Sequence, residues 1–589
     1  MKTIYNVKTW SLVALIAIAG SVQAQDNNLK RELTLEREYD PSVQDANKVN
    51  TLPIIKQPEI KKTTIDYATQ AVPTDPDKEI SVLPSGKVMT DIVYNKNKGY
   101  LNVGVGTYTN INGDLGYHIL NTDKDQLNLF FSHRSSGGKR EYLQEKGTKQ
   151  KVHLNDNLGG LNFMHYFDKA TLKLGARYGY NAFNYFGYPI SNPVSSIPLL
   201  VDSETKQIDQ QIRLNAGVNS KEGASLGYLL DFDYTNFSHK YGLSKADDGI
   251  KENTISVKAG LNTPFGGNQL IGVDGKADFF SYSLPTLPAT ALIVPEFENH
   301  AEITLSPYYK VEGDIWKIKL GANVMAITGD NDKLFVSPNI AADVEIANKT
   351  VLYLKADGKI QSNSAYELSQ MNRYINPWLA VQPSRNWLDG IVGLKSGVAP
   401  GFWFDVFAGY KATNNDAFFT QETILSGTEN NFGNFSNVIG LDSKVLYFGG
   451  QLKYSYQSLF DFSLKGVFNN WDIKESDNWT SGIVPDFEPY GRPKTEITAN
   501  IDVRPIDKLT VSAKYYLGSG RKTAQTVSYD WEAIDMDNIN ELNVTASYNL
   551  TSNVGIYGQL NNLLFQEYDL LYGYPAQGFN AMVGININF

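Results

Sequence analysis

The sequence predicts an all-β protein: a transmembrane antiparallel β-barrel of about 22 strands, with short periplasmic turns and long extracellular loops. Segments of roughly a dozen residues alternate apolar and polar side chains from about residue 98 to the C-terminus, which is the period of a strand. The connections between these segments are alternately short and long. No apolar run reaches the ~18 residues that a membrane helix needs, so any membrane crossing must use strands.

The first 24 residues are expected to be a secretory signal peptide. Lys2 and Lys8 precede a short apolar run at 10–19, and small residues lie around the expected cleavage site after Ala24. No cysteine follows this run, which argues against a bacterial lipid anchor. We therefore expect an exported mature chain that begins near Gln25.

The composition excludes several functional classes. The chain of 589 residues has no cysteine, which removes disulfides, thiol catalysis and cysteine-ligated metal sites. Its net charge is −10, and a surface that binds nucleic acid is basic, so no nucleic-acid partner is expected. A large soluble β protein and an outer-membrane barrel both fit this composition, and the order of the connections favours the barrel.

Residues 25–97 are expected to form an extended, proline-rich segment in the periplasm or in the lumen of the barrel. Prolines at positions 41, 53, 58, 73, 76 and 84 keep their neighbours extended. Apolar side chains such as Leu33, Tyr39, Ile54 and Ile65 exceed what a solvated linker carries. We expect this segment to dock onto the lumen, the periplasmic mouth or a partner protein, with a disordered tether as the alternative.

Residues 98–589 are expected to form the barrel. Ten tight turns are predicted at 122–125, 168–169, 220–223, 264–267, 312–314, 347–349, 399–401, 456–458, 505–507 and 550–553. Longer polar and aromatic connections lie between them, for example at 184–205, 361–382, 413–434, 470–492 and 519–536. Ten turns and eleven long connections join 22 strands and place both ends of the barrel on the periplasmic side.

The C-terminal stretch AMVGININF is predicted to be the strand that closes the barrel. Its apolar face, which includes Val583, Ile585, Ile587 and the terminal Phe589, is expected to face lipid. Asn586 and Asn588 then point into the lumen. The apolar face with its final aromatic residue resembles the signal that barrel-assembly machinery recognises.

The sequence offers no motif for catalysis or for a cofactor. The six histidines are scattered, without the spacing of a zinc site, and the acidic turns lack the glycine and distal glutamate of a calcium loop. No G-x-S-x-G elbow marks a nucleophilic serine, and the glycine-rich stretch at 104–113 opens no predicted helix. We predict that the chain is not an enzyme. A barrel protease or lipase, with catalytic groups far apart in sequence, is the alternative.

The long connections supply the candidate binding residues. They combine Asn, Asp and Gly with aromatic rings that suit the recognition of sugars, peptides or another protein. The candidates are Phe183, Tyr185, Phe418, Trp471, Trp479 and Phe487. The alternative is an interfacial girdle, because Trp and Tyr also gather at the membrane boundary.

The last hairpin resembles the end of TonB-dependent outer-membrane receptors. The resemblance rests on Asn562-Leu563, Tyr568, Tyr574-Pro575-Ala576 and Gly578 before the final strand, with departures at Phe565 and Phe579. It implies a 22-stranded barrel in the outer membrane of a Gram-negative bacterium, and the residue usage indicates a Bacteroidetes-type source. Receptors of this family carry a plug domain inside the barrel, and residues 25–97 are too few to encode a full plug.

Two functions follow from this resemblance. The first is ligand uptake across the outer membrane by a receptor-like barrel. The alternative is a plug-less barrel that serves as a scaffold or accessory subunit of an outer-membrane assembly or export complex. The expected partners are outer-membrane lipid, the barrel-assembly machinery during insertion, and a surface lipoprotein or another outer-membrane subunit. A barrel of this width needs a seal, and we expect the 25–97 segment to fill only part of the lumen.

Overall fold

The computed structural model describes residues 97–188, 206–242, 248–285, 297–329, 334–426, 429–475, 487–527 and 530–589. Side chains are not described at 421–426, 429–433, 525–527 and 530–532. All of these residues belong to one compact unit. Within them, no helix is long and apolar enough to cross a membrane. The expected signal peptide and all but the last residue of the 25–97 segment lie outside the described residues.

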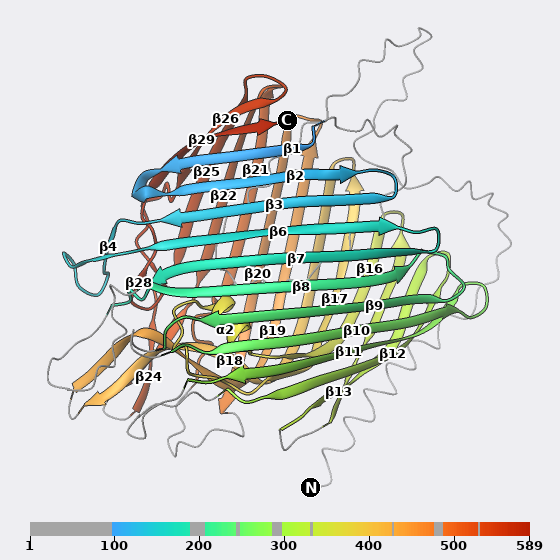
Figure 1. Ribbon diagram of the computed structural model, residues 1–589, viewed down its shortest axis with the longest axis horizontal. Coiled ribbons are helices and arrows are strands. Elements are labelled where there is room, and N and C mark those ends of the chain that lie inside the picture. The colour runs from blue at the N-terminus through green and yellow to red at the C-terminus, as the bar shows by residue number, and fades with distance from the viewer. Residues whose placement is uncertain are drawn as a thin grey trace. The chain divides into compact units, whose positions relative to one another are not determined.

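The architecture is a single antiparallel sheet closed on itself (Figure 1). Its segments are β1 (Gly99–Gly106), β2 (Ile111–Asn121), β3 (Asp125–Ser136), β6 (Leu154–Tyr166), β7 (Ala170–Asn184), β8 (Lys206–Ser220), β9 (Gly227–His239), β10 (Lys251–Pro264), β11 (Gln269–Ser283), β12 (His300–Glu312), β13 (Trp316–Ile327), β14 (Phe335–Pro338), β15 (Ile340–Ala347), β16 (Thr350–Gln361), β17 (Ser384–Ala399), β18 (Phe402–Ser426), β19 (Glu429–Tyr456), β20 (Phe460–Glu475), β21 (Thr495–Ile506), β22 (Leu509–Ser519), β25 (Ile539–Asn549), β26 (Val554–Asn561) and β29 (Asn580–Asn588).

The remaining elements lie in the connections. They are the 3-10 turn η1 (Thr107–Thr109), the hairpin β4 (Lys139–Glu141) and β5 (Lys149–Lys151), the helix α2 (Ala365–Met371), the hairpin β23 (Lys522–Val527) and β24 (Asp530–Asp535), and the pair β27 (Asp569–Leu571) and β28 (Tyr574–Pro575).

The barrel has 22 strands, as the sequence predicts. The sheet contains 23 segments, but β14 and β15 both pair with β13 and make one strand that is interrupted at Asn339. The last strand pairs with the first, with Val103 opposite Ile585 and Val105 opposite Val583. The predicted closure by the C-terminal strand is therefore confirmed.

All ten predicted tight turns separate consecutive strands, and the long connections gather at the opposite end of the barrel (Figure 1). Gly223, Gly266 and Gly401 adopt positive φ angles in three of these turns, a conformation that glycine reaches without strain. We call the two ends the short-turn end and the long-loop end.

Three of the expected loops are more ordered than the sequence predicts. The stretch at 413–434 is no irregular loop, because β18 and β19 continue through it as a long hairpin. Residues 361–382 contain α2, and residues 519–536 contain the hairpin β23–β24. The β18–β19 hairpin was missed because both of its faces are buried and each mixes polar with apolar residues. Asp416 and Phe418 lie on one face and Asn415 and Ala417 on the other, so no alternation marks the strand.

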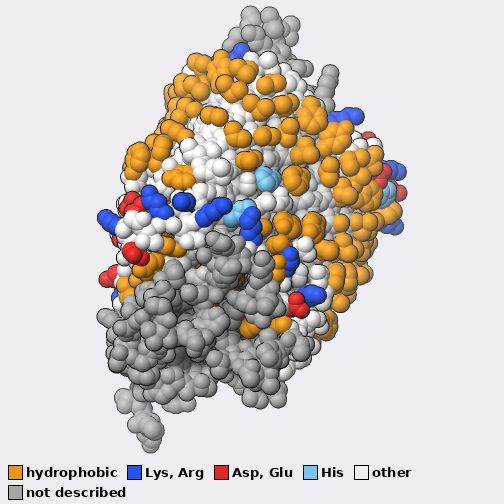
Figure 2. All heavy atoms as spheres, turned by 60° about the vertical axis from the view of Figure 1, so that its left-hand side comes forward, with side chains coloured by type: hydrophobic (Ala, Val, Ile, Leu, Met, Phe, Trp, Pro, Cys, Tyr) orange, Lys and Arg blue, Asp and Glu red, His pale blue; other side chains and the backbone are white. Residues whose placement is uncertain are grey.

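The two faces of the wall differ in polarity, as the alternation predicts. Leu352 pairs with Leu394, and Leu394 with Val406, so that these side chains share the outer face, where Figure 2 shows hydrophobic side chains spread over the wall. On the inner face the Tyr353 hydroxyl donates to Asp405 at 2.9 Å. An apolar outer surface and a polar interior are the properties of a barrel that spans an outer membrane.

Candidate functional site

A segment between β16 and β17 extends across the mouth of the barrel at the long-loop end. We call residues 362–383 the crossing loop. Ser364 caps α2, because its hydroxyl accepts a hydrogen bond from the Glu367 N–H at 3.3 Å, and the Glu367 carboxylate accepts one from the Asn363 N–H at 3.1 Å. This reciprocal pattern is a variant of the S-x-x-E capping box and starts the helix inside the loop.

The far end of the crossing loop is tied to the opposite wall. The Arg373 guanidinium forms two hydrogen bonds to the Asp156 carboxylate on β6, at 3.0 and 2.9 Å. Around the barrel, eight strands separate β6 from β16, and eleven separate it from β17 on the other side. The crossing loop therefore extends over most of the width of the lumen, and the ion pair holds its far end.

Further polar contacts hold the crossing loop to strands on the way. The Tyr366 N–H donates to Glu252 on β10 at 3.0 Å, and the Ser362 hydroxyl donates to Glu302 on β12 at 2.8 Å. The Ser369 hydroxyl lies 3.2 Å from Nε2 of His239 on β9. These wall residues lie at or near the long-loop ends of their strands, so the loop crosses at the rim.

An apolar core joins the crossing loop to both walls. Leu368 and Trp378 pack in one cluster with Phe237 of β9 and with Ala417 of the long hairpin. Two backbone hydrogen bonds connect Tyr374 and Asn376 of the loop to Ser436 of β19, each at 2.8 Å. The crossing loop and the long hairpin thus form one packed unit, which we call the cap.

An aromatic cluster surrounds the tip of the crossing loop. Tyr374 stacks on Tyr574 with ring centroids 4.1 Å apart, and the Tyr185 hydroxyl donates to the Ile375 carbonyl at 3.1 Å. The Arg373 guanidinium also lies over the ring of Phe183. The rings fix the position from which Arg373 reaches β6.

A third cluster supports the other face of the long hairpin. Arg492 binds Asp416 through two hydrogen bonds of 2.7 and 2.8 Å, and its guanidinium lies 4.1 Å from the centroid of Phe418 and 5.3 Å from that of Trp471. The hairpin is therefore buried between the crossing loop and the segment at 487–494.

The predicted binding residues lie in these clusters. Phe183, Tyr185 and Phe418 have no exposed surface, contrary to the exposure that their loop positions indicate. Trp471 and Phe487 are half-buried against the third cluster, and Trp479 lies outside the described residues. Their role in binding a ligand stays a prediction, since the described contacts are those of packing within the cap.

Sequence reasoning missed Arg373, Asp156 and Arg492. No local pattern indicates that Arg373 meets a residue 217 positions away. One signal was present: Ser364-x-x-Glu367 before apolar residues is a helix start. It would have located α2 but not the wall that the helix meets.

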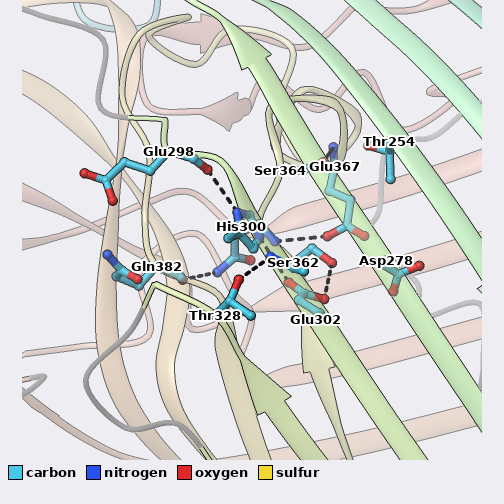
Figure 3. A network of polar contacts seen from close by, with 12 residues as sticks. Thr254, Asp278, Glu298, His300, Glu302, Thr328, Ser362, Ser364, Glu367 and Gln382 are labelled. Atoms are coloured by element: carbon cyan, nitrogen blue, oxygen red, sulfur yellow. Dashed lines mark hydrogen bonds and ion pairs between the residues drawn. The ribbon is translucent and has the colours of Figure 1, made fainter.

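Carboxylates gather where the crossing loop leaves β16. Figure 3 shows Glu302 and Glu367 there, and Glu252 is placed by the hydrogen bond that it accepts from the Tyr366 N–H. Glu252 and Glu302 come from the wall and are buried, and Glu367 comes from α2. Burial first, and then the charges of Glu302 and Glu252, raise the pKa of Glu367 to about 7. Among the residues that the structure describes, no three His, Cys, Asp or Glu side chains are arranged to hold a metal ion.

No protein-family model matches the sequence, and no curated protein matches it. Solved structures match its fold. The siderophore receptor PirA from Acinetobacter baumannii has a TM-score of 0.60 and 11% identity, covering 85% of this chain and 81% of that one. The ferripyoverdine receptor of the outer membrane of Pseudomonas aeruginosa, bound to ferripyoverdine, has a TM-score of 0.56 and 12% identity, covering 84% and 72%.

The copper transporter OprC matches with a TM-score of 0.57 and 10% identity, covering 83% of this chain and 80% of OprC. These three proteins are receptors and a transporter rather than enzymes. At such low identities the similarity establishes the fold, which is the 22-stranded barrel of outer-membrane receptors.

Proposed function

We propose that this protein is a receptor-like barrel that takes a ligand up across the outer membrane, with the cap as its outer gate. The observation that carries this proposal is the Arg373–Asp156 ion pair, which holds a loop from one wall against the opposite wall. The gate is held by polar contacts at its tip and along its length, and such contacts are exchanged for water when a loop opens.

The structural neighbours support this function. They are a siderophore receptor, a ferripyoverdine receptor of the outer membrane and a copper transporter. Their ligands differ, so the fold alone does not select one. We also propose that the 25–97 segment lies in the periplasm or the lumen, that the barrel-assembly machinery inserts the chain, and that a surface lipoprotein or another outer-membrane subunit accompanies it.

The test exploits the absence of cysteine from the chain. A Ser369→Cys/His239→Cys variant places two thiols where α2 meets β9, and a short cleavable thiol cross-linker fixes the gate to the wall. A deletion strain carrying the wild type, the double variant or either single variant is grown on defined iron–siderophore chelates and copper sources. We expect the deletion to impair growth on at least one source and the cross-linked variant to behave like the deletion.

Cleavage of the cross-linker should restore uptake, and the two single variants should support it throughout. The proposal is contradicted if the deletion strain takes up every source as the wild type does. Co-purification of assembly or export subunits in equal amounts would then make the scaffold the better function.

A further inference from the structure

The cap has a second feature that uptake alone does not require: carboxylates hold the crossing loop where it leaves β16. The Glu252 carboxylate accepts the Tyr366 N–H, and the Glu302 carboxylate accepts the Ser362 hydroxyl. Both donors are neutral groups of the crossing loop. In these two contacts the loop therefore brings no cationic side chain to the buried acids of the wall.

The crossing loop instead adds a third acid. Glu367 follows Tyr366 directly in α2, and its carboxylate turns back to the Asn363 N–H at 3.1 Å. Figure 3 shows Glu367 pointing toward the same region as Ser362 and Glu302. When the loop lies on the wall, Glu367 is thus brought close to Glu252 and Glu302, whose charges both act on it.

The basic groups nearby do not balance three ionised carboxylates. Lys276 on β11 acts on Glu367, but its ammonium is 2.7 Å from Asp278 and is shared with that acid. Nε2 of His300 on β12 lies 3.4 Å from Glu302, and Nδ1 of the same ring donates to the Glu298 carbonyl at 3.0 Å. Like charges held out of water repel strongly, and a proton on one of them relieves the repulsion.

We propose that Glu367 is a proton-controlled latch: the crossing loop stays on the wall while Glu367 is protonated and leaves the wall when Glu367 ionises. The crossing loop carries both Glu367 and Arg373. When the part of the loop around Glu367 leaves the wall, the segment that spans the mouth is freed as well. The inference rests on the proposed function only for its biological use, because opening of the loop is measured on the protein alone.

The direction of the pH dependence follows from the two states. With the loop on the wall the pKa of Glu367 is about 7, and in water a glutamate has its ordinary value of 4.5. The closed state therefore binds the proton more tightly. The stabilisation of the closed state by this proton is complete below pH 4.5 and is lost between pH 4.5 and 7. For one proton, the ratio of closed to open protein falls by at most about tenfold per pH unit.

The experiment measures the position of the loop directly. In the cysteine-free chain, Gln370→Cys on the exposed side of α2 and Glu222→Cys in a short turn carry spin labels, and the purified full chain is placed in lipid nanodiscs. Distance distributions are recorded from pH 4.5 to 8.5. We expect one narrow population at low pH and a second, displaced population that grows as the pH rises, with no ligand added.

Three variants identify the group that titrates. Glu367→Gln mimics the protonated acid and should remain closed throughout. Glu302→Gln removes a neighbouring negative charge, so the pKa of Glu367 in the closed state should fall. The opening transition should then move to lower pH, and the change in the closed population should become smaller. Glu345→Gln, at the short-turn end, is the matched control and should leave the wild-type curve unchanged.

Each result decides the proposal if the barrel is folded, which heat-modifiable migration shows. Distances that do not change between pH 4.5 and 8.5 in the wild type overturn the latch, and so does a transition in Glu367→Gln like that of the wild type. A transition carried by His300 would persist in Glu367→Gln and vanish in His300→Gln. If the loop of the purified protein opens as the pH rises but the deletion strain has no uptake defect, the latch stands and only the uptake function is refuted.

Discussion

Arg373 and Asp156 bind each other through two parallel hydrogen bonds across the mouth of the barrel, although 217 residues separate them. The pair joins the tip of the crossing loop to β6. Each side chain is about 30% exposed, so water competes for the contact, and the pair is suited to open and close rather than to fix the loop permanently.

Replacement of Arg373 by Lys should loosen the cap without unfolding the barrel. Lysine keeps the charge but loses the planar fork, and we expect the free energy for opening the crossing loop to fall by about 1–2 kcal/mol. Hydrogen exchange of residues 362–383 measures this change. Arg134→Lys, which alters the single 2.8 Å contact to Asp114 on the lumen wall, is the matched control and should leave exchange in the loop unchanged.

Aspartate should be tolerated on one face of the wall and not on the other. The pairing of β22 with β25 places Val511 and Val544 on one face and Thr510 and Thr545 on the opposite face. A charge on the lipid face costs roughly 2–4 kcal/mol at the midplane of the membrane, whereas water in the lumen solvates it. Urea unfolding in lipid vesicles should show this loss for Val511→Asp and Val544→Asp only. Equal losses at all four positions would refute the assignment of the faces.

The terminal aromatic residue should be needed for assembly. Phe589 stacks on Tyr117 with ring centroids 6.1 Å apart, and its backbone exchanges hydrogen bonds with Gly99 at the seam. Phe589→Asp should sharply lower the amount of heat-modifiable barrel in the outer membrane while leaving export to the periplasm intact. Normal amounts of folded Phe589→Asp protein would remove the role that we assign to this end as an assembly signal.

The segment before the barrel should contribute only part of the seal. We expect deletion of residues 30–95 to raise the permeability to antibiotics moderately, because the cap still crosses the mouth and the segment is about half the size of a usual domain. Antibiotic sensitivity of strains with matched protein levels measures this. A barrel that fails to fold without residues 30–95 would show that the segment is structural instead.

The barrel followed from the sequence because its determinants are local. Turn residues such as Gly223 and Gly401 and the period-two alternation of each strand are visible within a dozen residues, and all ten turns predicted from them separate strands in the structure. The short connection between β1 and β2 at 107–110 was not among them. The cap was hidden because its contacts are not local. Arg373 meets Asp156, and Tyr574 packs on Tyr374, across the whole barrel.

The candidate residues illustrate the same limit. Phe183 and Phe418 lie in segments whose polar neighbours predict exposure, and both rings are buried by loops from distant parts of the chain. Pattern and composition locate a long connection, but they do not say what the connection folds against. The position of a side chain within the cap therefore had to come from the structure.

The most direct test of the cap as a gate is the ionic conductance of the purified barrel in a planar lipid bilayer. A variant in which residues 363–383 are replaced by a short Gly-Ser linker is compared with the wild type at the same pH. We predict small, infrequent openings in the wild type and large, sustained conductance steps in the variant, since a barrel of 22 strands encloses a wide lumen. A wild-type barrel that already conducts like an open large pore, unchanged by removal of the crossing loop, would contradict the account.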